Sequence, residues 1–145
     1  MKDPAIINEL LKLKREDGLI LPKDVVEAAR SPKSPLHASF TWDNTKAAAE
    51  YRLWQARTLL RICVVMLPQN TQVTKAFVSL SSEVGYRSIE QVLSVKIQRE
   101  TMLDDAMDEL ERVRAKYNHL KELVGVFEVI ASRVKTLRAK TARRE

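Results

Sequence analysis

The clearest pattern of apolar and polar positions lies in the last third of the chain. From Leu103 to Val134, steps of three and four residues alternate between apolar or small side chains, so the pattern repeats every seven residues. Such a repeat keeps one face of a helix against a partner helix, and charged residues flank it here. We therefore expect self-association through repeat positions Leu103, Leu110, Val113, Tyr117, Leu120, Val124 and Phe127.

Two architectures fit this repeat. One is a single long helix from about residue 98 to residue 140 that associates with other copies of the chain. The other is a pair of helices, broken near Asn118 and His119 or at Gly125 and folded back on the N-terminal part. Gly125 favours a break because glycine destabilises a helix interior by about 1 kcal/mol.

Helical spacing also dominates the first sixty residues. It predicts helices over residues 4–15, 22–30 and about 44–60, with Asp3 and Asp43 as N-caps of the first and third. The third helix is expected to pack through a mainly apolar surface and to carry its charged residues mainly on polar faces, namely Glu50, Arg52, Arg57 and Arg61. The expected packing residues are Ala47, Ala48, Tyr51, Leu53, Trp54, Ala56, Leu59 and Leu60.

The pattern changes in the middle of the chain. A β-branched run over residues 62–67 and a loosely alternating run over residues 73–80 flank a turn-forming stretch. This predicts a β-hairpin at about residues 59–80, which should pack on helices or pair across a dimer, because an isolated hairpin is marginal in water. Ser88 with Gln91 forms a capping-box signature that begins a short helix through about Val95.

These elements predict a mainly α fold with one small β-hairpin, of the α+β class. Residues 1–96 would form a helical body with the hairpin, and residues 97–145 a coiled-coil-like helical region with a basic tail. No apolar stretch approaches the ~20 residues that a membrane helix needs, and the N-terminus lacks the apolar core of a signal peptide. The single cysteine, Cys63, lies in an apolar run and suits a buried thiol. We expect a cytoplasmic protein without a membrane partner.

The net charge of +6 is concentrated at the C-terminal end of the sequence. Residues 131–145 carry six cations against one acid, which gives +5 and leaves the other 130 residues close to neutral. Such a tail favours contact with DNA phosphates without reading base sequence. The alternative is a solvated helix end whose cations interact with the helix dipole. The candidate DNA-binding residues are Arg133, Lys135, Arg138, Lys140, Arg143 and Arg144.

Residues that carry catalytic or metal chemistry do not gather in the sequence. Three isolated glycines cannot build a phosphate-binding loop, and one cysteine with two distant histidines falls short of a zinc site. Asp104, Asp105, Asp108 and Glu109 are more typical of the acidic start of a helix than of a cation site. No local Ser-His-Asp or Cys-His set is present. We expect no enzyme, with no catalytic residues, no metal and no cofactor.

Several motifs are distinctive: SPLHASFTWD at residues 34–43, YRLWQAR at 51–57, GYRS at 85–88 and YNHLKEL at 117–123. With these motifs the chain, from about Leu10 to Ile130, resembles a family of small proteins encoded by tailed bacteriophages and prophages. The resemblance implies a phage or prophage origin and a bacterial cytoplasm as the setting, and it carries no catalytic residues.

Two functional hypotheses follow. The first is a homo-oligomeric accessory protein that binds DNA through the basic tail. The alternative is an adaptor or assembly factor, in which the heptad helix binds a phage or host protein.

Overall fold

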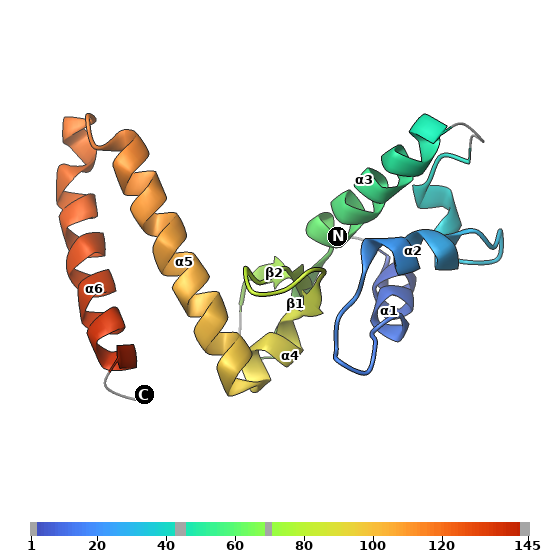
Figure 1. Ribbon diagram of the computed structural model, residues 1–145, viewed down its shortest axis with the longest axis horizontal. Helices are drawn as coiled ribbons and strands as arrows, with labels where there is room; N and C mark the ends of the chain where they lie inside the picture. Colours follow the sequence, from blue (N-terminus) through green and yellow to red (C-terminus); the bar gives the residue numbers. More distant parts are fainter. Residues whose placement is uncertain (1–2, 43–45, 69–70, 143–145) are drawn as a thin grey trace. The chain divides into compact units, whose positions relative to one another are not determined.

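The computed structural model describes residues 3–42, 46–68 and 71–142, and it is mainly helical with two small antiparallel strand pairs (Figure 1). The predicted α+β class is therefore confirmed. The chain divides into two compact units, an N-terminal unit, Met1–Arg99, and a C-terminal unit, Glu100–Glu145. The elements are α1 (Pro4–Lys12), α2 (Pro22–Ala29), the 3-10 helix η1 (His37–Ser39), α3 (Lys46–Ile62), β1 (Val64–Met66), β2 (Val73–Lys75), β3 (Phe77–Val78), β4 (Arg87–Ser88), α4 (Ile89–Ser94), α5 (Lys96–Tyr117), the 3-10 helix η2 (Lys121–Leu123) and α6 (Val124–Ala142).

Local capping signals define several helix starts. The Asp3 side chain accepts a hydrogen bond from the Ala5 amide, and the Ser88 hydroxyl accepts one from the Gln91 amide. Both caps were predicted, whereas the predicted cap Asp43 lies outside the described residues. Helix α1 ends at Lys12, earlier than predicted, because the following loop folds back on itself: the Arg15 amide donates to the Leu19 carbonyl at 2.9 Å.

The N-terminal unit has a contiguous apolar core. Helices α1, α2 and α3 contribute to it together with the strands, which gives the unit a fold stabilised mainly by burial of apolar surface. The buried residues of this core are Leu10, Ile20, Val25, Val26, Ala29, Leu36, Phe40, Ala56, Leu59, Leu60, Cys63, Ala76 and Phe77.

Strands β2 and β3 are separated by one residue, and each of them pairs with one other short strand. Strand β2 pairs with β1 and strand β3 pairs with β4, both antiparallel. Between β2 and β3, the Ala76 amide donates to the Cys63 carbonyl and the Ala76 carbonyl accepts from the Ile89 amide. The predicted hairpin is the β1–β2 pair, although it begins later than residue 59 because α3 continues to Ile62. The β3–β4 pair was not predicted.

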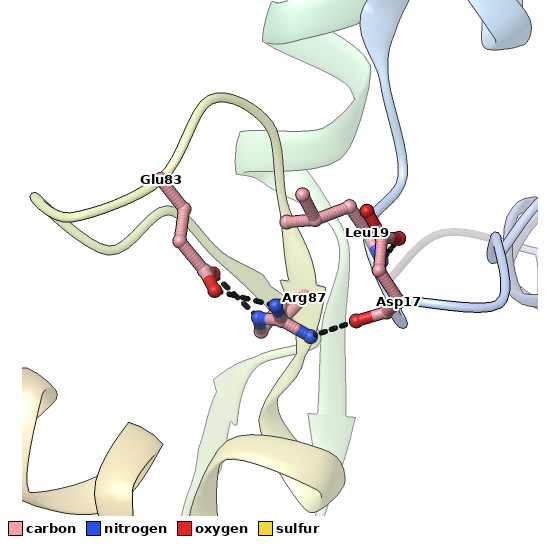
Figure 2. A network of polar contacts seen from close by, with 4 residues as sticks. All are labelled: Asp17, Leu19, Glu83 and Arg87. Carbon is pink, nitrogen blue, oxygen red and sulfur yellow. Dashed lines mark hydrogen bonds and ion pairs between the residues drawn. The ribbon is translucent and has the colours of Figure 1, made fainter.

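A buried arginine joins β4 to the loop between α1 and α2 (Figure 2). The Arg87 side chain, 6% exposed, donates to both carboxylate oxygens of Glu83 and, at 2.6 Å, to the Asp17 carbonyl. The hydrogen bonds to Glu83 raise the pKa of Arg87 above its ordinary value. Gly18, with φ +82°, lies against this network, and a Cβ there would come within 2.7 Å of the Arg87 guanidinium. This network has a structural role.

The C-terminal unit is a helical hairpin, so the predicted single helix over residues 98–140 is wrong and the predicted break into two helices is confirmed. The predicted packing of these helices on the N-terminal part stays a prediction. Figure 1 shows α6 folded back beside α5, and an ion pair between Arg138 and Asp108 links the two helices. The break falls at Asn118 and His119, whereas Gly125 lies in the first turn of α6. No helix within the described residues is long and apolar enough to cross a membrane.

Candidate functional site

The inner contact of the C-terminal hairpin is thin. Among the described residues of this unit, only Met107, Phe127 and Val134 are buried. Two of these, Phe127 and Val134, are positions of the heptad repeat, and both lie on α6. Met107 of α5 is not a repeat position. The heptad repeat is therefore split between the two helices, with its buried positions on α6.

The repeat positions of α5 lie on the surface. Leu103 is 42% exposed and Leu110 41%, and Val113 and Tyr117 are also exposed. The stripe begins beside the inward face of α5: Leu103 and Leu110 lie about 40° and 60° around the helix from the buried Met107. Leu110 lies about 160° from Asp108, which pairs with α6. We define the α5 stripe as Leu103, Ala106, Leu110, Val113 and Tyr117.

The remaining predicted self-association residues lie near the turn of the hairpin. Leu120 is 38% and Val124 44% exposed, whereas Phe127 is 8% exposed and packs inside. Phe127 also lines an open cleft of about 440 Å³ at this end of the hairpin, together with Arg114 and Ala115 of α5. Within the described hairpin, Phe127 is thus an internal contact, and the other six predicted residues are accessible on the surface.

Charge is segregated along α5. Residues 100–111 carry six acidic side chains and no basic one, and residues 112–117 carry three basic side chains and no acidic one. The acidic segment lies beside the basic end of α6, as the Arg138–Asp108 pair shows. The C-terminal unit therefore holds ten cations against nine acids, a net +1, and the N-terminal unit holds fifteen against ten, a net +5. Acidic residues elsewhere in the C-terminal unit offset the +5 of residues 131–145, so most of the net charge belongs to the N-terminal unit.

The six cations predicted to bind DNA differ in their surroundings. Arg133, Lys135 and Lys140 are exposed on α6. Arg138 donates to Asp108, and that hydrogen bond raises the pKa of Arg138. Arg143 and Arg144 lie outside the described residues.

A second exposed surface lies on α3 and was not predicted. Tyr51 and Trp54 were expected to pack inward, but they are 48% and 52% exposed, and their rings stack with centroids 5.5 Å apart. Ala48, Ala56, Leu59 and Leu60 occupy the buried face of α3 instead. Arg52, expected on a polar face, is also buried there, at 9% exposed. The apolar character of Tyr51 and Trp54 suggested burial; their position on the helix relative to the buried residues was the signal for exposure.

Metal-ligating side chains do not gather in the part of the chain that the structure describes. In residues 3–42, 46–68 and 71–142, no three side chains of His, Cys, Asp or Glu lie where they could hold a metal ion. Comparison with protein-family models, curated proteins and solved structures finds no match to this chain. The candidate sites are therefore the three surfaces described above: the α5 stripe, the exposed cations of α6 and the aromatic surface of α3.

Proposed function

We propose that this protein is a non-enzymatic assembly protein that pairs with a second copy of itself through the α5 stripe. The observation that carries the proposal is the exposure of this stripe along α5, beside the face that contains the buried Met107. A contiguous apolar face on a soluble protein marks an interaction site. The heptad spacing of this face fits a second helix that packs along it.

The charges of α5 favour an antiparallel arrangement of the two copies. Side by side in the same direction, the acidic segments 100–111 of both copies would face each other and repel. In opposite directions, each acidic segment lies near the basic segment 112–117 of the other copy. A two-fold axis near Leu110 generates this pairing, and the same surface then serves both copies.

The thin core of the hairpin supports the same conclusion. Two helices that bury three side chains between them gain little from the hydrophobic effect. Two hairpins joined along α5 make a four-helix arrangement in which the stripe becomes a central layer. A stable interface needs about 800 Å² from each partner, a size that helices of this length can supply.

The resemblance to phage and prophage proteins gives this assembly a setting. In this proposal it acts in an infected or lysogenic bacterium, as an accessory protein that joins copies of the N-terminal unit. The α5 stripe could instead receive a helix of a phage or host protein, which would make the protein an adaptor. Mass measurements distinguish these two occupants.

Sedimentation of the purified full chain tests the proposal. We expect a dimer that Leu110→Lys converts to a monomer, with the dissociation constant raised about a hundredfold or more, because two lysines would meet at the two-fold axis. The matched control is Val129→Lys: this valine is 64% exposed on α6 and does not belong to the stripe, so this variant should remain dimeric. A monomeric wild-type protein at high concentration would favour the adaptor and refute self-association.

A second candidate function is DNA binding through α6. The exposure of Arg133 and Lys140 favours it, because residues seven apart lie on one face of the helix. The acidic segment of α5 weakens it by reducing the net charge of the hairpin. Binding should weaken with salt, with a slope of about 0.9 for each neutralised phosphate, and Arg133→Glu with Lys140→Glu should abolish it. Removal of residues 132–145 should have the same effect.

A further inference from the structure

The aromatic surface of α3 is built unlike the rest of the N-terminal unit. Trp42, the other tryptophan, is engaged on several sides: its indole N–H donates to the His37 carbonyl, its ring stacks on His37, and Arg52 lies over it. Trp54 instead stacks on Tyr51 with an angle of 14° between the rings, and both remain about half exposed. The result is a flat aromatic platform on the surface.

Cations without a carboxylate partner lie next to this platform. Arg57 and Arg61 follow Trp54 by three and seven residues, so the three side chains share one face of α3. Arg61 donates to the Arg57 carbonyl and to the Thr58 hydroxyl, and the Lys75 ammonium donates to the Arg61 carbonyl at 2.7 Å. Within the described residues, no ion pair involves Arg57, Arg61 or Lys75.

This lack of pairing contrasts with three arginines of the same unit. Arg15, Arg30 and Arg87 each pair with a carboxylate, respectively Asp24, Glu27 and Glu83. The positive charge of the N-terminal unit, net +5, therefore includes a group of unneutralised cations at the end of α3.

Trp54 also lines an open cleft of about 270 Å³. Residues of η1 and α3 line it: Ala38, Ser39, Trp54, Gln55, Thr58, Leu59 and Ile62. Its volume lies below the range of about 300–1,000 Å³ typical of pockets for drug-sized ligands. Ser39, Gln55 and Thr58 supply polar atoms at its edge.

We propose that this surface binds single-stranded nucleic acid, with a base stacked on Trp54 and the adjoining phosphates held by Arg57, Arg61 and Lys75. An aromatic platform beside a row of cations is the combination that proteins use for unpaired strands, since every base has a π-face. A duplex hides those faces in its stack, so it would engage the cations alone. An acidic protein segment would satisfy the cations but has no flat rings in series to match the platform.

The test is fluorescence anisotropy of labelled oligonucleotides titrated with the full-length protein in a salt series. The probes are a single-stranded DNA of thymidines, the corresponding RNA of uridines, and a DNA duplex of equal length. We expect both single strands to bind more tightly than the duplex; a preference for one of them identifies which polymer is the ligand. Tryptophan emission of the wild-type protein should be quenched on binding, and Trp54→Phe, which retains only Trp42, should lose this quenching.

Matched variants separate stacking from charge. Trp54→Ala should weaken single-strand binding about tenfold, whereas Trp54→Phe should retain most of it because a ring remains. Arg57→Glu with Arg61→Glu should weaken binding more than tenfold and reduce the salt slope by about 0.7 for each phosphate that the variant no longer neutralises. All three positions are exposed, and circular dichroism of each variant verifies folding.

Three results would overturn this inference. The first is an absence of single-strand binding by the wild-type protein at low salt. The second is full affinity in folded Trp54→Ala. The third is binding abolished only in the α6 variant Arg133→Glu with Lys140→Glu, which would assign the binding to the tail. Self-association through α5 is measured separately by sedimentation, so the two proposals can fail independently.

Discussion

The two units of this chain bury apolar surface to very different extents. The N-terminal unit has a contiguous core in which Leu10, Ile20 and Leu60 are fully buried. The C-terminal unit, within its described residues, buries three side chains and exposes most of its heptad positions. A short helical hairpin of this kind gains too little from burial to offset its conformational entropy alone. We infer that the first unit can be stable by itself, whereas the second depends on what covers it.

The largest effect should come from the core of the N-terminal unit. Leu60→Ala should lower the free energy of unfolding by about 2–5 kcal/mol, because it removes a fully buried side chain and leaves a cavity. Thermal and urea denaturation measure this change, which should not depend on protein concentration. Val129→Ala, at an exposed valine, should change stability by less than about 0.5 kcal/mol. Equal effects at the two sites would contradict the contrast between the units.

The buried arginine gives a somewhat smaller effect. Arg87→Ala should cost about 3 kcal/mol, since it leaves Glu83 and the Asp17 carbonyl without their donor in a nearly buried site. Arg30→Ala is the control, because the Arg30–Glu27 pair is mostly exposed and should contribute less than about 0.5 kcal/mol. If urea denaturation gave the two variants the same stability, the role assigned to the Arg87 network would be wrong.

Protein concentration should separate the two units directly. Association stabilises the C-terminal unit by mass action. Each tenfold fall in the concentration of free partner lowers that stabilisation by about 1.4 kcal/mol, as long as the concentration stays well above the dissociation constant. Hydrogen exchange followed by mass spectrometry should therefore show faster exchange on dilution for amides of residues 100–142. Amides of α1, α2 and α3 should be unaffected. Uniform behaviour along the chain would argue against a partner-dependent hairpin.

The smallest effect concerns pH. The Arg15 guanidinium, which donates to Asp24 at 2.7 Å, lowers the pKa of that carboxyl below its ordinary value. A lowered folded-state pKa contributes stability that is present above the unfolded pKa and is lost as the pH falls through the folded one. Stability of the wild-type protein should thus decline below about pH 4. Asp24→Asn should show a shallower decline in the same window; an unchanged pH profile would exclude this pair as a contributor.

Sequence reasoning predicted what depends on local chemistry. The caps Asp3 and Ser88 depend only on amides two or three residues further along the chain. The helices and the β1–β2 hairpin follow from periodicity and turn residues. The β3–β4 pair was missed because its strands have two residues each, and their pairing depends on contacts across the intervening turn.

The candidate surfaces could be identified only from the three-dimensional arrangement of the residues. The heptad repeat identified the apolar positions of α5 but not their direction, which is set by Met107 and by the Asp108–Arg138 pair. The basic tail was interpreted from the sequence alone, which does not show that the acidic segment 100–111 lies beside it in space. Tyr51 and Trp54 were assigned to packing because large aromatic residues favour burial. Their exposure follows from which face of α3 is buried, and that is decided by the tertiary fold.

The antiparallel dimer can be tested by the distance between spin labels on its two copies, measured by pulsed electron resonance. Labels are attached through Glu109→Cys or Lys116→Cys in a Cys63→Ala background, so that each copy carries one label. Antiparallel pairing about Leu110 predicts axial offsets of about 3 Å at residue 109 and about 18 Å at residue 116, from a rise of 1.5 Å per residue. The Lys116→Cys labels should therefore lie clearly farther apart than the Glu109→Cys labels. Equal short distances at both positions would indicate parallel helices and contradict the antiparallel dimer, as would the absence of any coupling between labels.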